Sequence, residues 1–259
     1  MSIVIKYGGN AMTDPATRRA VAAGLRNLAN QDGGGARRPV PPVVVHGGGP
    51  YIQAALDEAG LEHRFERGLR VTSPESVVVI ERVLTMLSKE LAFEIGPAVG
   101  ITARDARCMT AEVRDPVLGR VGRVTNVDPS VLSALRGAGL VPVLACLALD
   151  AAGGALNVNG DEAAGAVAGA LGEGVVFLTN VPGVLDDPAA PDSLLSSLTR
   201  SEALQRIADG RIAGGMIPKV EAALDALAMG APFAVVADGR DPHGVERALA
   251  GGGTRILGS

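Results

Sequence analysis

The sequence predicts an α/β protein, a three-layer αβα sandwich around a central, mostly parallel sheet. Two observations support this fold class. Short runs rich in Val and Ile alternate with longer stretches of helical periodicity, which is typical of a parallel sheet covered by helices. The chain also has 259 residues, of which 47% are hydrophobic, enough for one large unit or two lobes that share a sheet.

The expected strands are short, β-branched and bounded by glycine, proline or charged residues. The first of them ends at Gly8-Gly9, and the second breaks into the run Gly47–Gly49. The predicted strands cover residues 3–6, 43–45, 141–147, 175–179, 233–237 and 254–257. Between Asp105 and Thr125, short segments interrupted by glycine and charge indicate hairpins.

The expected helices begin at residues that favour helix initiation. Asp14 followed by Pro15 predicts a helix to about Asn30, and Asp128-Pro129 opens another by the same rule. Further helices are expected over residues 51–59, 75–95 and 201–208, in an alanine-rich segment that ends at residue 171, and from 214 through 229. The chain is expected to divide around residues 145–160, into lobes 1–156 and 157–259 across a shared sheet.

Composition and charge exclude several classes of function. The chain carries 24 basic and 28 acidic residues, a net charge of −4, which disfavours a general binder of nucleic acid or anionic membranes. No apolar run approaches the ~18 residues of a membrane span, and the first residues lack a signal-peptide core, so a cytoplasmic location is expected. Cys108 and Cys146 match no metal-ligand or redox spacing and are expected to be core residues. No metal ligands are predicted.

Three glycine-rich breaks indicate a site for an anion. They are Gly8-Gly9, Gly47–Gly49 and Gly214-Gly215. Glycine allows backbone N–H groups to approach a ligand, and the N-terminus of a following helix favours negative charge. The Walker P-loop, the G-x-G-x-x-G fingerprint and the protein-kinase motifs are all missing from the sequence. Nucleotide binding would therefore need another architecture.

Two lysines make phosphoryl chemistry the more specific hypothesis. Lys6 stands at the carboxyl end of the first strand, where open parallel sheets form crevices, and Lys219 follows the third glycine break by a short spacing. Two lysines that converge on one phosphoryl group can neutralise charge on its oxygens. The alternative for each lysine alone is an ordinary solvated surface charge.

Seven motifs in order along the chain resemble the amino acid kinase family, and within it the acetylglutamate kinase branch. The most characteristic are Lys-Tyr-Gly-Gly-Asn-Ala-Met from residue 6 and Gly-Met-Ile-Pro-Lys from residue 215. The others begin at His46, Gly68, Asn157, Val181 and Gly253, so the resemblance spans essentially the whole chain. It implies the amino acid kinase fold, with ATP as phosphate donor, Mg²⁺ as its companion ion, and N-acetyl-L-glutamate as acceptor. The implied reaction is phosphorylation of the acceptor's side-chain carboxylate, a step of arginine biosynthesis.

The resemblance also implies a role for individual residues. Lys6 and Lys219 correspond to the two lysines that act on the transferred phosphoryl group, and Asp161 to the carboxylate that holds both. The residues that correspond to acetylglutamate contacts are Gly48, Gly49, Arg70 and Asn157, with Arg70 on the α-carboxylate. Those that correspond to nucleotide contacts are Gly8, Gly9, Asn180, Gly183, Leu185, Gly214 and Met216. The first lobe is implied to bind acetylglutamate and to dimerise, and the second to bind ATP.

Alternatives remain at the level of residues and of function. Arg70 has the alternative of an exposed charge, and Asp161 and Asn157 that of helix-cap or turn residues. Asn180 and Gly160 stand where aspartate and alanine are common in the branch. In both departures the chain is similar to a sister branch that phosphorylates carrier-protein-bound aminoadipate in lysine biosynthesis. A non-catalytic nucleotide-binding module is a further alternative. Because the first strand begins at residue 3, no N-terminal helix of the arginine-inhibited members is expected, which favours a plain homodimer.

Overall fold

The fold is built on one eight-stranded sheet. We describe it from a computed structural model, which covers residues 2–8, 12–30, 40–187, 189–190, 192–241 and 243–258. From one edge to the other, the strands are β12 (Ser197–Thr199), β14 (Thr254–Leu257), β13 (Phe233–Asp238), β11 (Gly174–Thr179), β1 (Ile3–Tyr7), β2 (Val43–His46), β8 (Val141–Ala145) and β5 (Ala98–Thr102). Neighbouring strands run parallel except β13 and β14. The predicted α/β class and mostly parallel sheet are confirmed.

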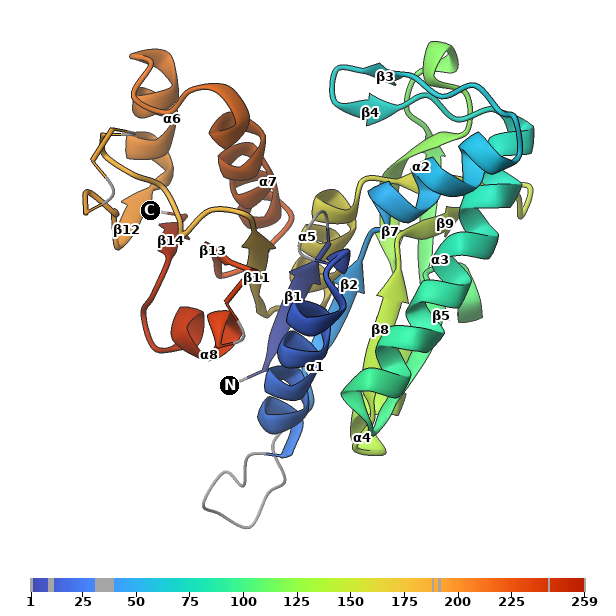
Figure 1. Ribbon diagram of the computed structural model, residues 1–259, viewed down its shortest axis with the longest axis horizontal. Helices are drawn as coiled ribbons and strands as arrows, with labels where there is room; N and C mark the ends of the chain where they lie inside the picture. The colour runs from blue at the N-terminus through green and yellow to red at the C-terminus, as the bar shows by residue number, and fades with distance from the viewer. Residues whose placement is uncertain are drawn as a thin grey trace.

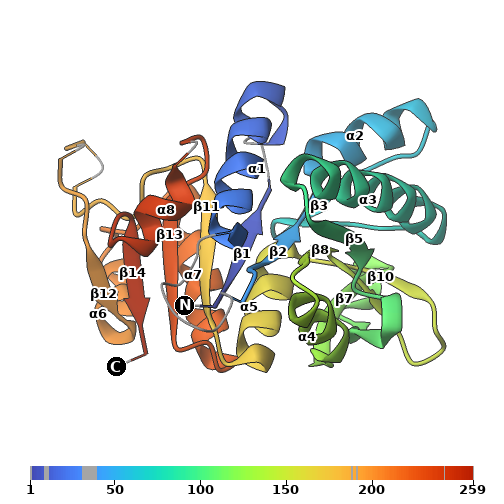
Figure 2. The ribbon, with the colours of Figure 1, turned by 90° about the horizontal axis from the view of Figure 1, so that it is seen from below.

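Helices cover both faces of this sheet, which gives the predicted three layers (Figure 2). On β1, Ile3, Ile5 and Tyr7 pack on one face with α1 (Pro15–Asn30), α8 (Gly244–Leu249) and the second half of α3 (Pro74–Ile95). Val4 packs on the other face with α5 (Gly160–Leu171) and α7 (Ile217–Ala228). Because successive side chains of a strand point to opposite faces, Lys6 shares the face of Val4 and is directed toward α5.

Small residues bring α5 and α7 close together. A methyl group at Gly169 would lie 2.0 Å from the backbone oxygen of Met229, and one at Gly165 would lie 3.0 Å from Ala226. Glycine is thus the only residue that fits at position 169 without moving the chain. This close packing sets the N-terminal ends of the two helices on the same side of the sheet, and these ends carry Asp161 and Lys219.

The remaining elements surround this framework. β6 (Met109–Val113), β7 (Val121–Val127), β9 (Leu147–Leu149) and β10 (Ala155–Val158) form a small closed barrel, and β3 (Phe65–Glu66) and β4 (Leu69–Arg70) form a hairpin. α2 (Gly49–Glu58), α4 (Ser130–Gly137) and α6 (Arg200–Ala208) complete the helices of the described chain, together with short 3₁₀ turns at Asp105–Arg107, Pro116–Leu118 and Gly214–Met216. None of the helices in these described ranges combines the length and apolarity that a bilayer crossing demands.

Most predicted elements are present, with β8 and β9 replacing the single strand expected over 141–147. Strands β3, β4, β5, β10 and β12 and helix α8 were not predicted. β1 and β11, from the two sides of the expected lobe boundary, pair along Ile3–Lys6, so the sheet is shared between the halves of the chain. Figure 1 shows most of the C-terminal half on one side of this junction and most of the N-terminal half on the other, with α5 of the C-terminal half lying against β1 and β2. The assignment of functions to lobes 1–156 and 157–259 stays a prediction.

Candidate active site

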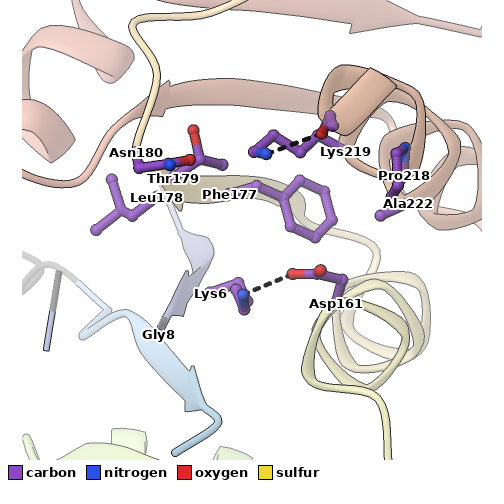
Figure 3. A pocket seen from close by; sticks show the side chains of 11 residues that line it. Lys6, Gly8, Asp161, Phe177, Leu178, Thr179, Asn180, Pro218, Lys219 and Ala222 are labelled. Atoms are coloured by element: carbon purple, nitrogen blue, oxygen red, sulfur yellow. Dashed lines mark hydrogen bonds and ion pairs between the residues drawn. The ribbon is translucent and has the colours of Figure 1, made fainter. Parts of the chain in front are cut away.

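A cavity of about 370 Å³ opens where the carboxyl ends of β1 and β11 meet the N-terminal ends of α5 and α7 (Figure 3). Its lining comes from four segments that are far apart in the sequence. The lining residues are Lys6, Gly8, Asp161, Phe177, Leu178, Thr179, Asn180, Gly215, Pro218, Lys219 and Ala222. The carboxyl edge of a parallel sheet is where ligands of α/β proteins bind.

Lys6 and Asp161 form an ion pair on one side of this cavity. Lys6 Nζ lies 2.8 Å from Asp161 Oδ1, and the two side chains are 17% and 34% exposed. The α5 N-cap is Asn159, whose side chain accepts hydrogen bonds from the backbone N–H groups of Asp161 and Glu162. The cap leaves the Asp161 carboxylate free to pair with Lys6, so the alternative that Asp161 itself is the cap does not hold.

Lys219 lies opposite this pair across the cavity (Figure 3). Its ammonium group donates a hydrogen bond to the carbonyl oxygen of Gly215, at 3.0 Å. Asp161 thus pairs with Lys6, whereas the hydrogen bond of Lys219 goes to Gly215, just before the start of its own helix. The two lysines are brought to one cavity, and a role for Asp161 in holding both stays a prediction.

The choice of lysine in the cavity stands out against the rest of the chain. Of 24 basic residues, only Lys6, Lys89 and Lys219 are lysines, and the other 21 are arginines. Two of the three lysines therefore line this one cavity. Because arginine serves as the general surface cation in this chain, lysine at these two positions is better explained by a need for a compact ammonium group.

Two of the seven predicted nucleotide residues line the cavity, four do not, and one lies outside the described residues. Gly8 and Asn180 line the cavity, whereas Gly9 lies outside the described residues. Gly183, Leu185, Gly214 and Met216 are not among the lining residues, although Gly215, beside two of them, is. Leu185 forms a β-bridge with Leu194, and Met216 packs against the core. A contact between these four residues and a nucleotide stays a prediction.

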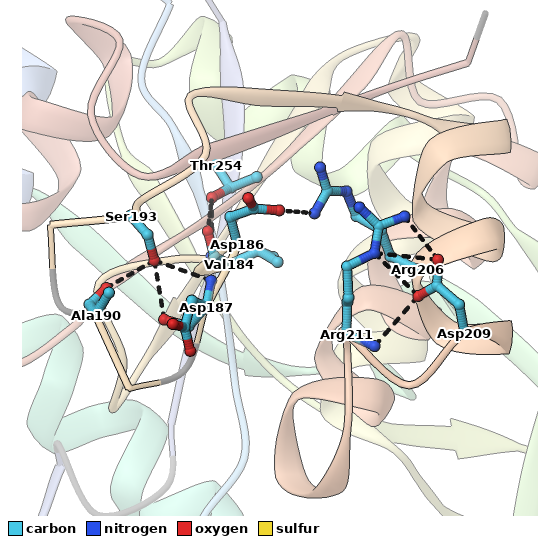
Figure 4. Close-up of polar contacts among 9 residues, drawn as sticks. All are labelled: Val184, Asp186, Asp187, Ala190, Ser193, Arg206, Asp209, Arg211 and Thr254. Carbon is cyan, nitrogen blue, oxygen red and sulfur yellow. Dashed lines mark hydrogen bonds and ion pairs between the residues drawn. The ribbon is translucent and has the colours of Figure 1, made fainter.

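The loop after β11 is held in place by polar contacts (Figure 4). The buried Thr254 hydroxyl accepts a hydrogen bond from the Val184 N–H at 2.8 Å and donates one to the Leu195 carbonyl at 2.6 Å. Gly183 has φ +153°, and a methyl group there would lie 2.7 Å from Thr254 Oγ1. An ion pair with Arg206 of α6 holds Asp186 and lowers the pKa of that carboxyl. This loop is therefore held at Val184 by Thr254 and at Asp186 by Arg206.

Three of the four predicted acetylglutamate residues, Asn157, Arg70 and Gly49, are linked by one chain of hydrogen bonds. Asn157 Nδ2 donates to Thr72 Oγ1 at 3.2 Å, and that hydroxyl donates to the Arg70 carbonyl at 2.8 Å. Arg70 Nη2 donates to the Gly49 carbonyl at 3.3 Å. Next to Gly49, Gly48 packs tightly on α3, since a methyl group there would lie 2.9 Å from Leu84 Cδ2.

Arg70 is a buried cation that pairs with no carboxylate of the described residues. It is 8% exposed, and burial lowers its pKa. The other buried arginine of the described chain, Arg136, pairs with Glu173 at 2.9 Å. No carboxylate of the described residues lies within 4.0 Å of the Arg70 guanidinium, which bonds to Gln53 and Gly49 and covers the Phe65 ring. The exposed-charge alternative for Arg70 is wrong, because the side chain is buried.

The Gly47–Gly49 segment connects the cavity that holds Lys6 with the predicted acetylglutamate residues around Arg70. A methyl group at Gly160 would lie 3.6 Å from Lys6 Cε, 3.7 Å from the Gly47 nitrogen and 3.8 Å from Cys146 Sγ. Lys6, the start of α5 and the loop after β2 thus meet at one point. These distances are ordinary contacts, so the alanine that is common at position 160 in the branch would fit here without displacing Lys6.

His46 sits beneath this loop as a neutral residue. It is fully buried, its Nδ1–H donates to the Gly47 carbonyl at 2.9 Å, and burial lowers its pKa to about 4. The unfolded chain, with a histidine pKa near 6.5, binds a proton more readily than the folded chain. The contribution of neutral His46 to the free energy of unfolding is therefore complete above pH ~6.5 and is lost as the pH falls toward 4.

We expect His46 to cost about 3 kcal/mol of the free energy of unfolding between pH 7 and pH 4. Urea unfolding over this range should show the loss in the unchanged protein and a shallower pH dependence in His46→Asn. His243→Asn, at an exposed position, is the control and should follow the unchanged protein. Parallel curves for all three proteins would contradict the buried neutral state.

Sequence reasoning missed several residues that line the cavity. Phe177, Leu178 and Thr179 occupy the end of β11, and Pro218 and Ala222 face the cavity from α7. The signal available for the first three was their position at the carboxyl end of a predicted parallel strand. Ala222 lies three residues after Lys219 and four after Pro218 on α7, and both spacings place side chains on one face of a helix.

Known proteins are similar in sequence to this chain over almost its whole length. Residues 1–238 match the amino acid kinase family. A protein of Deinococcus radiodurans named acetylglutamate kinase is 52% identical, over 98% of this chain and 100% of its own length. One of the same name from Corynebacterium urealyticum is 46% identical, over 94% of this chain and 81% of its own.

Solved structures agree at the level of the fold. A crystal structure of N-acetylglutamate synthase from Neisseria gonorrhoeae, complexed with coenzyme A and N-acetyl-glutamate, superposes with a TM-score of 0.81. It covers 100% of this chain and 59% of that one, at 22% identity. The family match, the two relatives and the shared architecture lead to one conclusion: the chain belongs to the amino acid kinase family and, within it, to the acetylglutamate kinases.

Proposed function

We propose that the chain catalyses ATP-dependent phosphorylation of the side-chain carboxylate of N-acetyl-L-glutamate, as a step of arginine biosynthesis. The observation that carries the proposal is the meeting of Lys6 and Lys219 in one cavity that adjoins, through the loop at Gly47, a buried arginine without a carboxylate partner. The relatives named acetylglutamate kinase support the choice of substrate.

The acceptor needs no general base. A glutamyl-type carboxylate has a pKa near 4.3 and is ionised at neutral pH, so its oxygen can attack the γ-phosphorus directly. The new bond is a carboxylate oxygen–phosphorus bond, and the bond that breaks joins that phosphorus to the β,γ-bridging oxygen, which leaves with ADP. The obstacle is repulsion between the anionic acceptor and the anionic nucleotide.

Lys6 and Lys219 are proposed to remove this obstacle. They approach the cavity from opposite sides, so that their ammonium groups can bind oxygens of the phosphoryl group as it moves from donor to acceptor. The N-terminal ends of α5 and α7 add partial positive charge on the same side. Asp161 orients Lys6, and its proposed role is to position that ammonium group.

Arg70 is proposed to bind the α-carboxylate of the acceptor. Its planar guanidinium can donate two parallel hydrogen bonds to a carboxylate, and it lies in a buried place without such a partner. Gly48, Gly49 and Asn157 are proposed to complete this part of the site. On the nucleotide side, we propose contacts from Gly8, Gly9, Asn180, Gly183, Leu185, Gly214 and Met216.

Mg²⁺ is proposed to enter with the nucleotide. The described residues contain no group of three or more His, Cys, Asp or Glu side chains that could hold a metal ion, and the cavity's one carboxylate, Asp161, is paired with Lys6. These residues do not fit a protein-held metal site. The ion would be bound by phosphate oxygens, whose charge it reduces, and the roles of the residues do not depend on it.

A substrate panel tests the function. ATP consumption would be measured with acetylglutamate, glutamate, aspartate, carbamate and carrier-bound aminoadipate, and the acyl phosphate would be trapped with hydroxylamine as a hydroxamate. We expect turnover and hydroxamate with acetylglutamate at a kcat/KM far above the other acceptors. Preference for carrier-bound aminoadipate, or no turnover with any acceptor, would contradict the proposal.

We also propose a homodimer in which α3 lies at the interface. Val78, Met86 and Phe93 are exposed apolar residues on α3, with exposed fractions of 46%, 62% and 87%. α3 packs beside β5, the last strand of the sheet, so a partner could join here. Light scattering should give twice the chain mass for the unchanged protein and a single chain mass for Phe93→Asp. A monomeric unchanged protein would contradict the dimer.

The cytoplasmic location stays a prediction.

A further inference from the structure

Arg70 is buried close to one acidic residue, Asp57, yet is not paired with it. Asp57 is the carboxylate whose charge acts on Arg70, raising its pKa against the lowering by burial. In the described structure, no Asp57–Arg70 ion pair forms within 4.0 Å; Asp57 instead pairs with His63 at 2.8 Å. Hydrogen bonds from His63 and Gln53 lower the pKa of Asp57, so this carboxylate stays charged.

Gln53 lies between these two charges. Its Oε1 accepts a hydrogen bond from Arg70 Nη1 at 3.2 Å, and its Nε2 donates to both oxygens of Asp57, at 3.3 and 3.2 Å. Nε2 also contacts the His63 ring. Gln53 and Asp57 stand four residues apart on α2, where side chains are neighbours.

An amide is the chemistry that this position requires. Its oxygen accepts from the guanidinium and its nitrogen donates to the carboxylate, so both charged groups are satisfied without being joined. A glutamate at position 53 would give Arg70 an internal counterion and would face Asp57 as a like charge. An apolar side chain would leave a hydrogen bond of the buried guanidinium unmade.

We propose that Gln53 is a positioning residue that sets specificity: it holds the Arg70 guanidinium in place while keeping it unneutralised, so that the carboxylate bound there must come from the acceptor. The proposal rests on the proposed function, in which Arg70 binds the α-carboxylate. It assigns to a neutral α2 side chain the preference for acceptors that carry two carboxylates.

The test compares Gln53→Glu with Gln53→Met in the full-length protein. We expect Gln53→Glu to raise the KM for acetylglutamate roughly tenfold or more, the scale of one hydrogen bond between charged groups, with kcat and the KM for ATP nearly unchanged. Gln53→Met, which removes the hydrogen bonds but adds no charge, should raise this KM only about threefold. Equal effects of the two variants would overturn the role of charge.

Two further measurements separate charge from a loss of structure. In the double variant Gln53→Glu with Asp57→Asn, the like-charge repulsion is removed, so thermal stability should return while the KM stays high. The probe 4-acetamidobutyrate is acetylglutamate without its α-carboxylate, and Gln53→Glu should leave its inhibition constant unchanged. A KM restored in the double variant, or an equal loss of 4-acetamidobutyrate binding, would overturn the proposal.

Failure of the proposed function gives a different result. In that case the unchanged protein does not turn over acetylglutamate, or Arg70→Met leaves its KM unaltered. If Arg70→Met raises the KM and Gln53→Glu does not, the proposed function stands and the role of Gln53 is overturned.

Discussion

Replacing Lys6 or Lys219 with methionine is expected to lower kcat by about 10²–10³-fold, the loss found when one preorganised donor to a transition state is removed. The KM for acetylglutamate should change little, because the ammonium groups are proposed to act on the moving phosphoryl group. The measurement is steady-state turnover with saturating ATP and acetylglutamate.

The third lysine provides a matched control. Lys89 lies on α3, where its ammonium group donates to the Gly100 carbonyl, away from the cavity lining. Lys89→Met makes the same chemical change and should retain kcat within about twofold, the scatter expected of a substitution away from the site. Loss of kcat in Lys89→Met equal to that in Lys6→Met would show that the effect is not specific to the cavity.

The two buried arginines are expected to give opposite results. Arg70→Met should lower kcat/KM for acetylglutamate about 10²-fold, because a buried, hydrogen-bonded contact with the α-carboxylate is lost. Its free energy of unfolding should change by less than about 1 kcal/mol, since an uncompensated buried charge is removed together with its hydrogen bonds.

Arg136→Met should instead destabilise the protein by about 3–5 kcal/mol, because it leaves Glu173 as an unpaired, largely buried carboxylate. It also removes the hydrogen bond from Arg136 Nε to the Pro41 carbonyl, at 2.7 Å. Folded Arg136→Met should keep the KM for acetylglutamate. Urea unfolding and steady-state kinetics on both variants check the contrast, and a large stability loss in Arg70→Met with unchanged kinetics would refute it.

Much of the fold could be predicted because local signals and the final structure agree. Asp14 with Pro15 marks the start of α1, and the β-branched run Val43–Val45 lies within β2. Strand β5 was missed because Gly100 interrupts its pattern, and the reason for that glycine is non-local: a methyl group there would lie 2.4 Å from the Ser88 carbonyl of α3. The small barrel depends on pairings between distant strands, such as β7 with β10, for which the sequence carries no local signal.

The site could be predicted as far as its chemistry is visible in residue type. A lysine such as Lys6 has few structural uses at a strand end, and the structure brings it to one cavity with Lys219 and Gly8. Phe177 was missed because it is both a core residue and a lining residue, and its place at the carboxyl end of a predicted strand is shared with residues of the core alone. Gln53 was missed because Arg70, the partner that gives it a role, reaches it only through the packing of α2 beside the β3–β4 hairpin.

Two ammonium groups from distant parts of the chain, those of Lys6 and Lys219, are proposed to act on one phosphoryl group. A crystal structure with MgADP, aluminium fluoride and acetylglutamate, a mimic of the transferring group, tests it most directly. We predict Lys6 Nζ and Lys219 Nζ each within about 3 Å of a ligand atom on the aluminium or of the oxygen that bridges it to ADP. If either nitrogen stays on its present partner, Asp161 or the Gly215 carbonyl, without reaching the mimic, the account is contradicted.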